Sequence, residues 1–180
     1  MPYIIILLVV IVLLVVVWII SVSNKLNRAI VKIEEADSGI DVALTKRYDV
    51  LTKMMDVVKG YAKHEKETLF EVINLRAGMT TEEKMDANNK MSSNFEKINV
   101  LAEAYPELKS SENYKTLQQS IVEVEEHLQA ARRMYNSNVS IFNQMLVTFP
   151  TSMIANSKGL TKKNFFEAEE VKKQDVKMDL

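Results

Sequence analysis

The chain has 180 residues, 47% of them apolar, and its 23 basic and 24 acidic side chains leave a net charge of −1. This balance argues against a general nucleic-acid binder, which needs a basic surplus. The absence of cysteine excludes a disulfide scaffold and thiolate metal sites.

Residues 1–23 predict a transmembrane anchor. Ile4 to Ile20 is an unbroken run of 17 Ile, Leu, Val and Trp residues, and with its flanks it makes about 30 Å of helix, the thickness of a hydrocarbon core. Tyr3 and Trp18 stand near its two ends, where interfacial aromatic side chains are common. A cleaved signal peptide is the alternative, since Ser21-Val22-Ser23 offers a small-x-small site. A retained anchor is favoured because no basic residue precedes the run and because the run is long.

The charges beside the anchor predict its orientation. No basic side chain precedes the apolar run, whereas Lys25, Arg28 and Lys32 follow it. Basic residues are retained on the cytoplasmic side of a membrane. We therefore expect a single-pass protein with its N-terminus outside and its C-terminal domain in the cytoplasm.

The chain beyond Asn24 predicts helices, because it lacks alternating strand patterns and the whole sequence has only four Gly and three Pro. We expect the first helix to continue out of the anchor and to end near Gly78, a natural stop. Apolar residues recur in it every three or four positions. This stripe comprises Leu26, Ile30, Ile33, Ile40, Leu44, Leu51, Met54, Val58 and Tyr61, and drifts later to Ala62, Leu69 and Ile73.

Two further long helices follow. Thr80 with Glu83 forms a capping-box pattern that starts the second helix, which runs to about Ala104 with an apolar stripe of Met85, Met91, Phe95, Ile98 and Leu101. Pro106 breaks the chain, and Ser110 or Ser111 can cap the third helix. Its stripe is Tyr114, Leu117, Ile121, Val124, Leu128, Ala131, Tyr135, Asn138, Phe142, Met145 and Phe149.

Pro150 should end the third helix, and Thr151-Ser152 can start a short fourth turn through Ile154. The expected fold is all-α: an N-terminal transmembrane helix that leads into an antiparallel up-and-down helical bundle of the four-helix type. We place the anchor at 1–23, the bundle at 24–158 and a charged, partly disordered tail at 159–180, in which Phe165-Phe166 can dock. The third stripe packs in the bundle core or, alternatively, as a coiled coil against a second protomer.

Few residues suggest chemistry. His64-Glu65 begins a zinc-protease helix motif, but Thr68 stands where the second His is needed. His127 has Val124 three residues before it, so a carboxylate di-metal pattern also fails. We expect no catalytic residue, no cofactor, no metal site and no nucleic-acid partner.

Polar residues that interrupt the apolar stripes are candidates for another role. Asp37, Arg47 and Asn138 either reach water at the bundle surface or form buried polar contacts that fix helix register. The basic stretch with Lys59, Lys63, His64 and Lys66 is either a solvated face or a candidate interaction site.

The sequence resembles the LemA family of bacterial membrane proteins. Matching pieces run in order along nearly the whole chain. They are Ile40-Asp41-Val42, Lys46-Arg47-Tyr48-Asp49, Val58 to Leu69 (VKGYAKHEKETL), Ser111-Glu112-Asn113-Tyr114, Ala130 to Asn136 (AARRMYN), Phe149-Pro150 with Ile154-Ala155, and Phe165-Phe166-Glu167-Ala168. The resemblance implies an anchored four-helix bundle with a short outer N-terminus, and no established activity. Related members have been tied to membrane organelle formation, which suggests membrane shaping or scaffolding.

We therefore expect a non-enzymatic scaffold or partner-recruiting protein at the bacterial membrane, whose partners are the lipid bilayer, other membrane proteins or a second copy of the chain. The alternative is a membrane-tethered sensor or adaptor that binds a small ligand or a regulatory protein. Its feature would be a pocket lined by Tyr48, Tyr61, Tyr114 and Tyr135.

Overall fold

One uninterrupted helix contains both the apolar run and the first stripe of the bundle. In the computed structural model, which describes residues 2–61 and 70–167, this helix is α1 (Pro2–Tyr61). It has no Pro or Gly between Ile4 and Ser38, so no residue in this stretch disfavours helix strongly. The prediction that the anchor continues into the first helix of the bundle is confirmed.

Four more helices follow, and no strand occurs among the described residues. They are α2 (Thr81–Ala104), α3 (Pro106–Ser110), α4 (Glu112–Val147) and α5 (Thr151–Ser157). The all-α bundle is therefore confirmed. Pro106 begins α3 at the first helical turn, where a proline needs no hydrogen-bond donor. The Ser111 hydroxyl oxygen accepts a hydrogen bond from the backbone N–H of Tyr114 at 3.3 Å, so Ser111 caps α4 as predicted.

The chain forms two compact units. We call Met1–Ala36 with Met134–Asn164 the anchor unit, and Asp37–Arg133 with Phe165–Leu180 the bundle unit. The division therefore lies at residues 36/37, 133/134 and 164/165. The predicted boundaries at 23/24 and 158/159 stay predictions.

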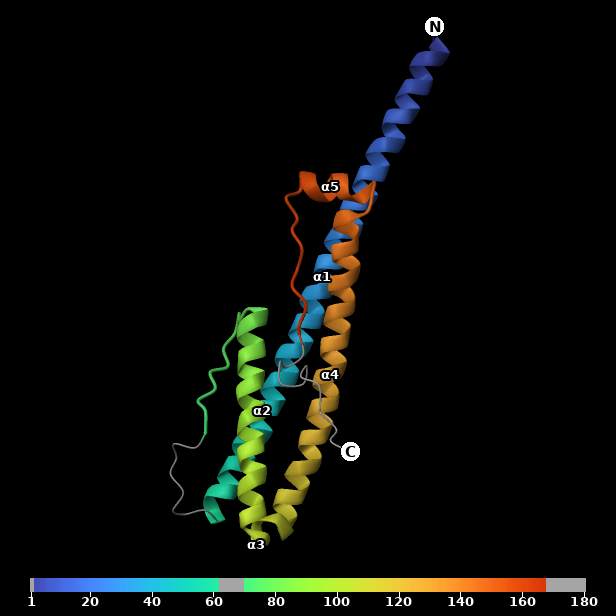
Figure 1. Ribbon diagram of the computed structural model, residues 1–180. Helices are drawn as coiled ribbons and strands as arrows, with labels where there is room; N and C mark the ends of the chain where they lie inside the picture. The colour runs from blue at the N-terminus through green and yellow to red at the C-terminus, as the bar shows by residue number, and fades with distance from the viewer. Residues whose placement is uncertain (1, 62–69, 168–180) are drawn as a thin grey trace, which may run out of the picture. The chain divides into compact units, whose positions relative to one another are not determined.

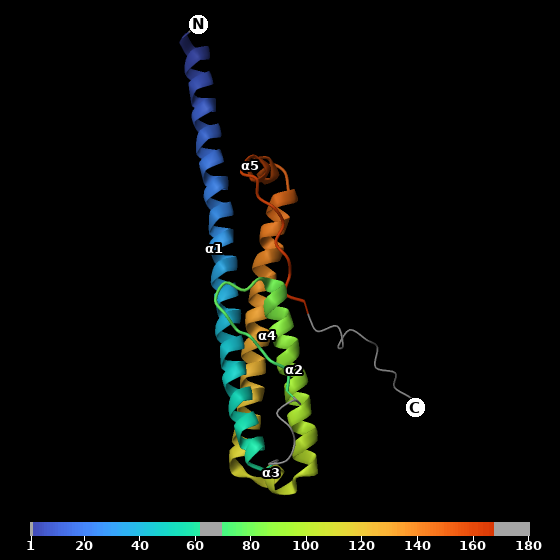
Figure 2. The same cartoon turned by 90° about the vertical axis from the view of Figure 1, so that its left-hand side faces the viewer.

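The core of the bundle unit lies between α1, α2 and α4. Buried side chains come from α1 and α2, with Leu108 of α3 and Tyr114 of α4. They are Leu51, Met54, Val58, Met91, Phe95, Ile98, Ala102, Leu108 and Tyr114. Figures 1 and 2 show the three long helices side by side in this unit, with α3 joining the ends of α2 and α4.

Within the bundle unit α2 runs parallel to α1, which differs from the expected antiparallel pair. Lys84 contacts Asp37 and Asp41, and further along both helices Arg47 contacts Asn88 and Ser92, so residue numbers rise together. The reason is that α1 ends at Tyr61, before Gly78, and that residues 70–80 are non-helical and lie beside α2 (Figure 1). The prediction of a helix to Gly78 is wrong. Gly78 instead takes a positive φ of 75° in the turn before α2.

An asparagine holds this non-helical segment to α2. The backbone N–H of Glu71 donates to the Asn94 side-chain oxygen at 2.8 Å, and the Asn94 amide donates back to the Glu71 carbonyl at 2.9 Å. The Glu71 carboxylate also accepts from the hydroxyl of Ser93, which with Lys97 lowers its pKa. Asn143 holds Lys163 in the same two-bond way in the anchor unit, at 2.9 Å for each bond.

The buried stripe of α4 differs from the predicted heptads in its second half. Arg132, Val139 and Leu146 are buried, whereas the predicted Ala131, Asn138 and Met145 are half-buried. A straight helix has 3.6 residues per turn, and a strict heptad repeat drifts around it. The predicted stripe steps by three residues after Leu128, to Ala131. The buried positions step by four, to Arg132, and this keeps the stripe on one face of α4.

The capping box at the start of α2 is confirmed. The Glu83 backbone N–H donates to the Thr80 hydroxyl at 3.2 Å, and the Thr80 backbone N–H donates to the Glu83 carboxylate at 2.8 Å, which lowers the pKa of Glu83. We expect Thr80→Ala to lower the free energy of unfolding by about 1 kcal/mol because it removes the cap. Urea unfolding of the detergent-solubilised full-length protein, followed by circular dichroism, measures this. Thr80→Ser keeps the acceptor and should retain the stability; an unchanged Thr80→Ala protein would contradict the role of the cap.

Candidate functional site

The apolar run of α1 exposes its side chains, as a segment that faces lipid must. α1 is the one helix among the described residues that is long and apolar enough to cross a membrane. Tyr3, Ile4 and Ile20 are all exposed, and Trp18 is at the edge of exposure with 38% of its surface accessible. Within the described residues, no part of the chain covers this surface, and the transmembrane role of Tyr3, Ile4, Trp18 and Ile20 stays a prediction.

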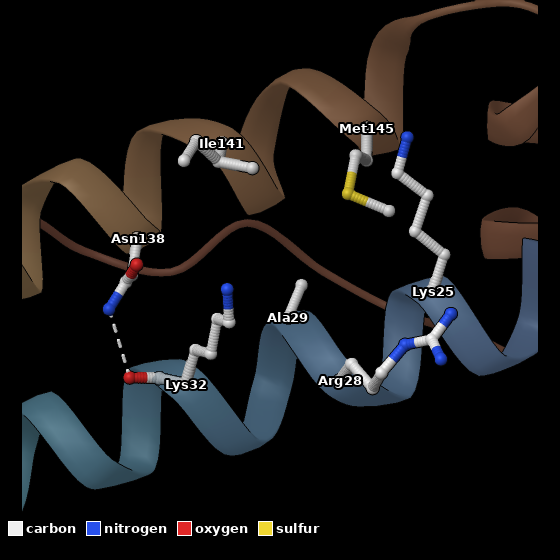
Figure 3. Close-up of a pocket in the computed structure, with 7 residues that line it drawn as sticks. All are labelled: Lys25, Arg28, Ala29, Lys32, Asn138, Ile141 and Met145. Atoms are coloured by element: carbon white, nitrogen blue, oxygen red, sulfur yellow. Dashed lines mark hydrogen bonds between the residues drawn. The ribbon is translucent and has the colours of Figure 1, made fainter.

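A groove lies between α1 and α4 in the anchor unit, directly after the apolar run. Its volume is about 200 Å³, and it is lined by Lys25, Arg28, Ala29, Lys32, Asn138, Ile141 and Met145. Figure 3 shows Lys25 and Lys32 extending from α1 toward α4, with Ile141 and Met145 on the facing helix. One wall is therefore cationic and the other largely apolar.

Asn138 fixes the spacing of the two walls. Its side-chain amide donates a hydrogen bond to the backbone carbonyl of Lys32 at 3.0 Å (Figure 3). This bond satisfies the half-buried amide within the anchor unit. It leaves the Lys32 ammonium directed into the groove.

A second polar site lies inside the bundle unit, around the buried guanidinium of Arg47. It donates to the Asn88 carbonyl and to the Ser92 hydroxyl, both at 2.9 Å, to the Asn88 side-chain oxygen, and it pairs with Glu125. The guanidinium also lies over the Phe95 ring, 5.4 Å from its centroid. These contacts join three helices, since Arg47 is on α1, Asn88 on α2 and Glu125 on α4.

Lys84 forms the neighbouring ion-pair site. Its ammonium lies 2.8 Å from the Asp37 carboxylate and 2.7 Å from that of Asp41, and its side chain is 2% exposed. Burial by itself would lower the pKa of Lys84. The hydrogen bonds to the two aspartates outweigh burial and raise this pKa above its ordinary value.

The predicted site residues are thus brought into three different places. Asp37 pairs with Lys84, Arg47 is buried in the bundle unit, and Asn138 lines the groove of the anchor unit. Lys59 is exposed near the end of α1, and Lys63, His64 and Lys66 lie outside the described residues. Within residues 2–61 and 70–167, no group of three or more His, Asp or Glu side chains could hold a metal ion.

Sequence reasoning missed four buried polar residues, Lys84, Asn88, Asn94 and Arg132. A signal for two of them exists, because Lys84 and Asn88 extend the stripe of Met91, Phe95 and Ile98 backward with the same spacing. Arg132 also forms a cation–π contact, since its guanidinium lies 4.8 Å from the centroid of the buried Phe166 ring. The docking predicted for Phe165-Phe166 is therefore made by Phe166.

Asn94 and Asn143 each form two hydrogen bonds to the backbone of one residue, and we expect replacing them to have separate local effects. Asn94→Ala should speed hydrogen exchange of the Glu71 amide by roughly two- to ten-fold, because the lost bond is part-buried and contributes about 0.5–1.5 kcal/mol. Asn143→Ala should do the same at Lys163 and leave Glu71 unchanged, so each variant is the control for the other. Exchange mass spectrometry of the full-length protein measures both. If either variant lost protection from hydrogen exchange at both Glu71 and Lys163, the two asparagines would not act independently.

These features define a class: a membrane-anchored, all-α bundle protein whose charged side chains link helices. A family model described as "LemA family" matches residues 36–180. Protein LemA of Metamycoplasma hominis is 31% identical to the chain over 158 residues, which covers 85% of this chain and 72% of that protein. The chain belongs to the LemA family, and the resemblance noted from its motifs is confirmed.

Proposed function

We propose that the protein is a non-enzymatic scaffold that recruits partners, or a second copy of itself, at the bacterial cell membrane. The observation that carries the proposal is the continuity of α1, which supplies both the apolar run and a packed helix of the bundle unit. The bundle is thus attached through a helix rather than through a flexible linker. The buried charges of Arg47 and Lys84 join helices to one another. Such contacts hold the helices in place, which supports a structural role for these two side chains.

The partner surface can be located through exposed valines. Val42 on α1, Val100 on α2 and Val122 on α4 expose 55%, 69% and 59% of their surface. In membranes, crosslinking of the full-length protein should give a discrete dimer or heteromer. We expect one of the three changes Val42→Lys, Val100→Lys and Val122→Lys to abolish this crosslinked species. That change identifies the helix that carries the partner surface, and the other two changes are its controls. A strictly monomeric protein by light scattering that also retains no crosslinked partner would refute the scaffold.

The orientation is part of the same proposal. The chain lacks cysteine, so Ser157→Cys and Tyr3→Cys each create a unique label. With the bundle in the cytoplasm, a membrane-impermeant thiol reagent should label intact cells at position 3 and not at position 157. Labelling at 157 would reverse the topology.

A sensor or adaptor is the second candidate, favoured by an open groove of about 590 Å³ in the bundle unit. Of the four tyrosines, Tyr114 lines it, and its hydroxyl donates to Asn99 at 3.1 Å and accepts from Gln118 at 2.9 Å. Burial raises the pKa of Tyr114. Tyr61 is exposed, and the Tyr135 hydroxyl donates to the Asn164 carbonyl of the anchor unit. Native mass spectrometry would support this candidate if a small molecule copurified with the full-length protein and was lost in Tyr114→Phe.

A further inference from the structure

The groove of the anchor unit concentrates cationic groups that form no ion pair with a described residue. Lys25, Arg28 and Lys32 line it, all three are exposed, and none takes part in the ion pairs found within residues 2–61 and 70–167. They lie on one face of α1, because their spacing of three and four residues is about one helical turn. An anionic ligand would meet all three.

Lys25 lies at the level of the head-group layer, and the other two cations lie beyond it. At 1.5 Å per residue, Lys25, Arg28 and Lys32 lie about 4.5, 9 and 15 Å beyond Val22, where the apolar run with its flanks completes about 30 Å of helix. The polar layer of a bilayer extends roughly 5–7 Å beyond the hydrocarbon on each side. Long cationic side chains also reach back toward the membrane surface.

The opposite wall is apolar, and α5 with Phe149 just before it adds exposed apolar side chains near the same level of α1. Ile141 lines the groove and exposes 52% of its surface, although it faces a cationic wall. The Lys158 ammonium donates to the Ser23 hydroxyl and the Asn27 side-chain oxygen, each at 2.8 Å, which places the end of α5 beside the start of the groove. Phe149 and Met153, just before and within α5, expose 76% and 60%.

We propose that the groove binds the head group of an anionic phospholipid, with its phosphate between Lys25, Arg28 and Lys32 and an acyl chain along Ile141 and Met145. A lipid is amphiphilic, so it satisfies both walls at once. A free phosphate would leave the apolar wall in water. Basic pockets beside transmembrane helices recognise anionic head groups by this combination of charge and apolar contact.

The test is a native mass-spectrometry titration of the full-length protein in a neutral detergent. The probes are dioleoyl phosphatidylglycerol, dioleoyl phosphatidylcholine and inorganic phosphate. Each cation is expected to contribute about five-fold to affinity. The triple change Lys25→Gln, Arg28→Gln, Lys32→Gln should therefore weaken phosphatidylglycerol binding roughly 100-fold. The side chains are exposed, so the fold should persist, and circular dichroism checks this.

The matched control replaces Lys46, Lys53 and Arg133 by Gln, two exposed lysines of α1 and one exposed arginine of α4, all in the bundle unit. This variant has the same change of charge and should bind phosphatidylglycerol like the unmodified protein. Ile141→Asn should weaken lipid binding without changing charge, which keeps the proposal testable if the triple variant does not fold.

Four results would overturn the proposal. Equal binding of phosphatidylcholine and phosphatidylglycerol would show that the groove does not recognise the charge of the head group. Displacement of the lipid by inorganic phosphate at equal concentration would show that the ligand is a free anion. An equal loss in the control triple variant would reduce the effect to net charge. Unchanged binding in both groove variants would place the lipid elsewhere.

Discussion

Replacing Arg47 with Ala is expected to lower the free energy of unfolding by about 3–5 kcal/mol. The guanidinium donates to Asn88 and Ser92 and pairs with Glu125, and 5% of the residue is exposed. The change withdraws a charged donor from the Asn88 side chain, which is 1% exposed, and leaves a cavity beside Phe95. A loss of this size would be among the largest that a single substitution causes.

Denaturation of the detergent-solubilised full-length protein by urea, monitored by circular dichroism, measures the effect. Lys46→Ala, at the exposed neighbouring position, is the control and should stay within about 0.5 kcal/mol of the unmodified protein. Arg47→Lys should recover only part of the loss, because an ammonium cannot reproduce the planar set of donors. Equal stability of Arg47→Ala and Lys46→Ala would contradict a structural role for the buried guanidinium.

These contacts show how polar residues within the apolar stripes can fix the register between helices. Arg47 reaches Asn88 and Ser92, two residues one turn apart on α2, and Lys84 lies one turn before Asn88. A shift of α2 by one turn against α1 would separate each cation from its partners. We therefore propose that Arg47 and Asp37 fix the register of the parallel α1–α2 pair, a role that buried polar groups have in other helical assemblies.

Local signals in the sequence predicted the helix starts well. Thr80 with Glu83 and Ser111 before Tyr114 are short-range hydrogen-bonding patterns, and short-range patterns are visible in the sequence itself. The candidate membrane span was equally visible, because hydrophobicity and length define such a helix. The direction of α2 was not, since it depends on where α1 ends.

The end of α1 was mispredicted because apolar spacing is ambiguous. Phe70, Ile73 and Leu75 pack against the core of the bundle unit from a non-helical segment, yet Ile73 also fits the helical stripe. The groove could be predicted only in part. Lys25, Arg28 and Lys32 indicated a membrane boundary, but Ile141 and Met145 are more than 100 residues away in the chain and join them only in the folded anchor unit.

Lys84→Ala is expected to lower the free energy of unfolding by about 2–3 kcal/mol, whereas Lys84→Met should cost less than about 1 kcal/mol. Alanine removes three methylene groups from a side chain that is 2% exposed, and methionine refills this space. Asp37 and Asp41 are 37% and 54% exposed, so water can solvate them when the ammonium is absent. Equal losses in the two variants would show that the ion pairs, and not the buried stem, provide the stability.

The pH dependence of the same pair isolates the charge of Lys84. Its pKa is raised in the folded state, so the stabilisation is complete below the unfolded value of 10.5 and is lost as the pH rises through the higher folded value. Unfolding of the unmodified protein and of Lys84→Met between about pH 8 and pH 12 measures this. The advantage of the unmodified protein over Lys84→Met should be constant up to about pH 10 and decline above it. The difference between the two proteins cancels the titration of the other lysines. A difference that stays constant or grows above pH 11 would mean that the ammonium contributes nothing to the folded state, and that Lys84 acts through its methylene groups alone.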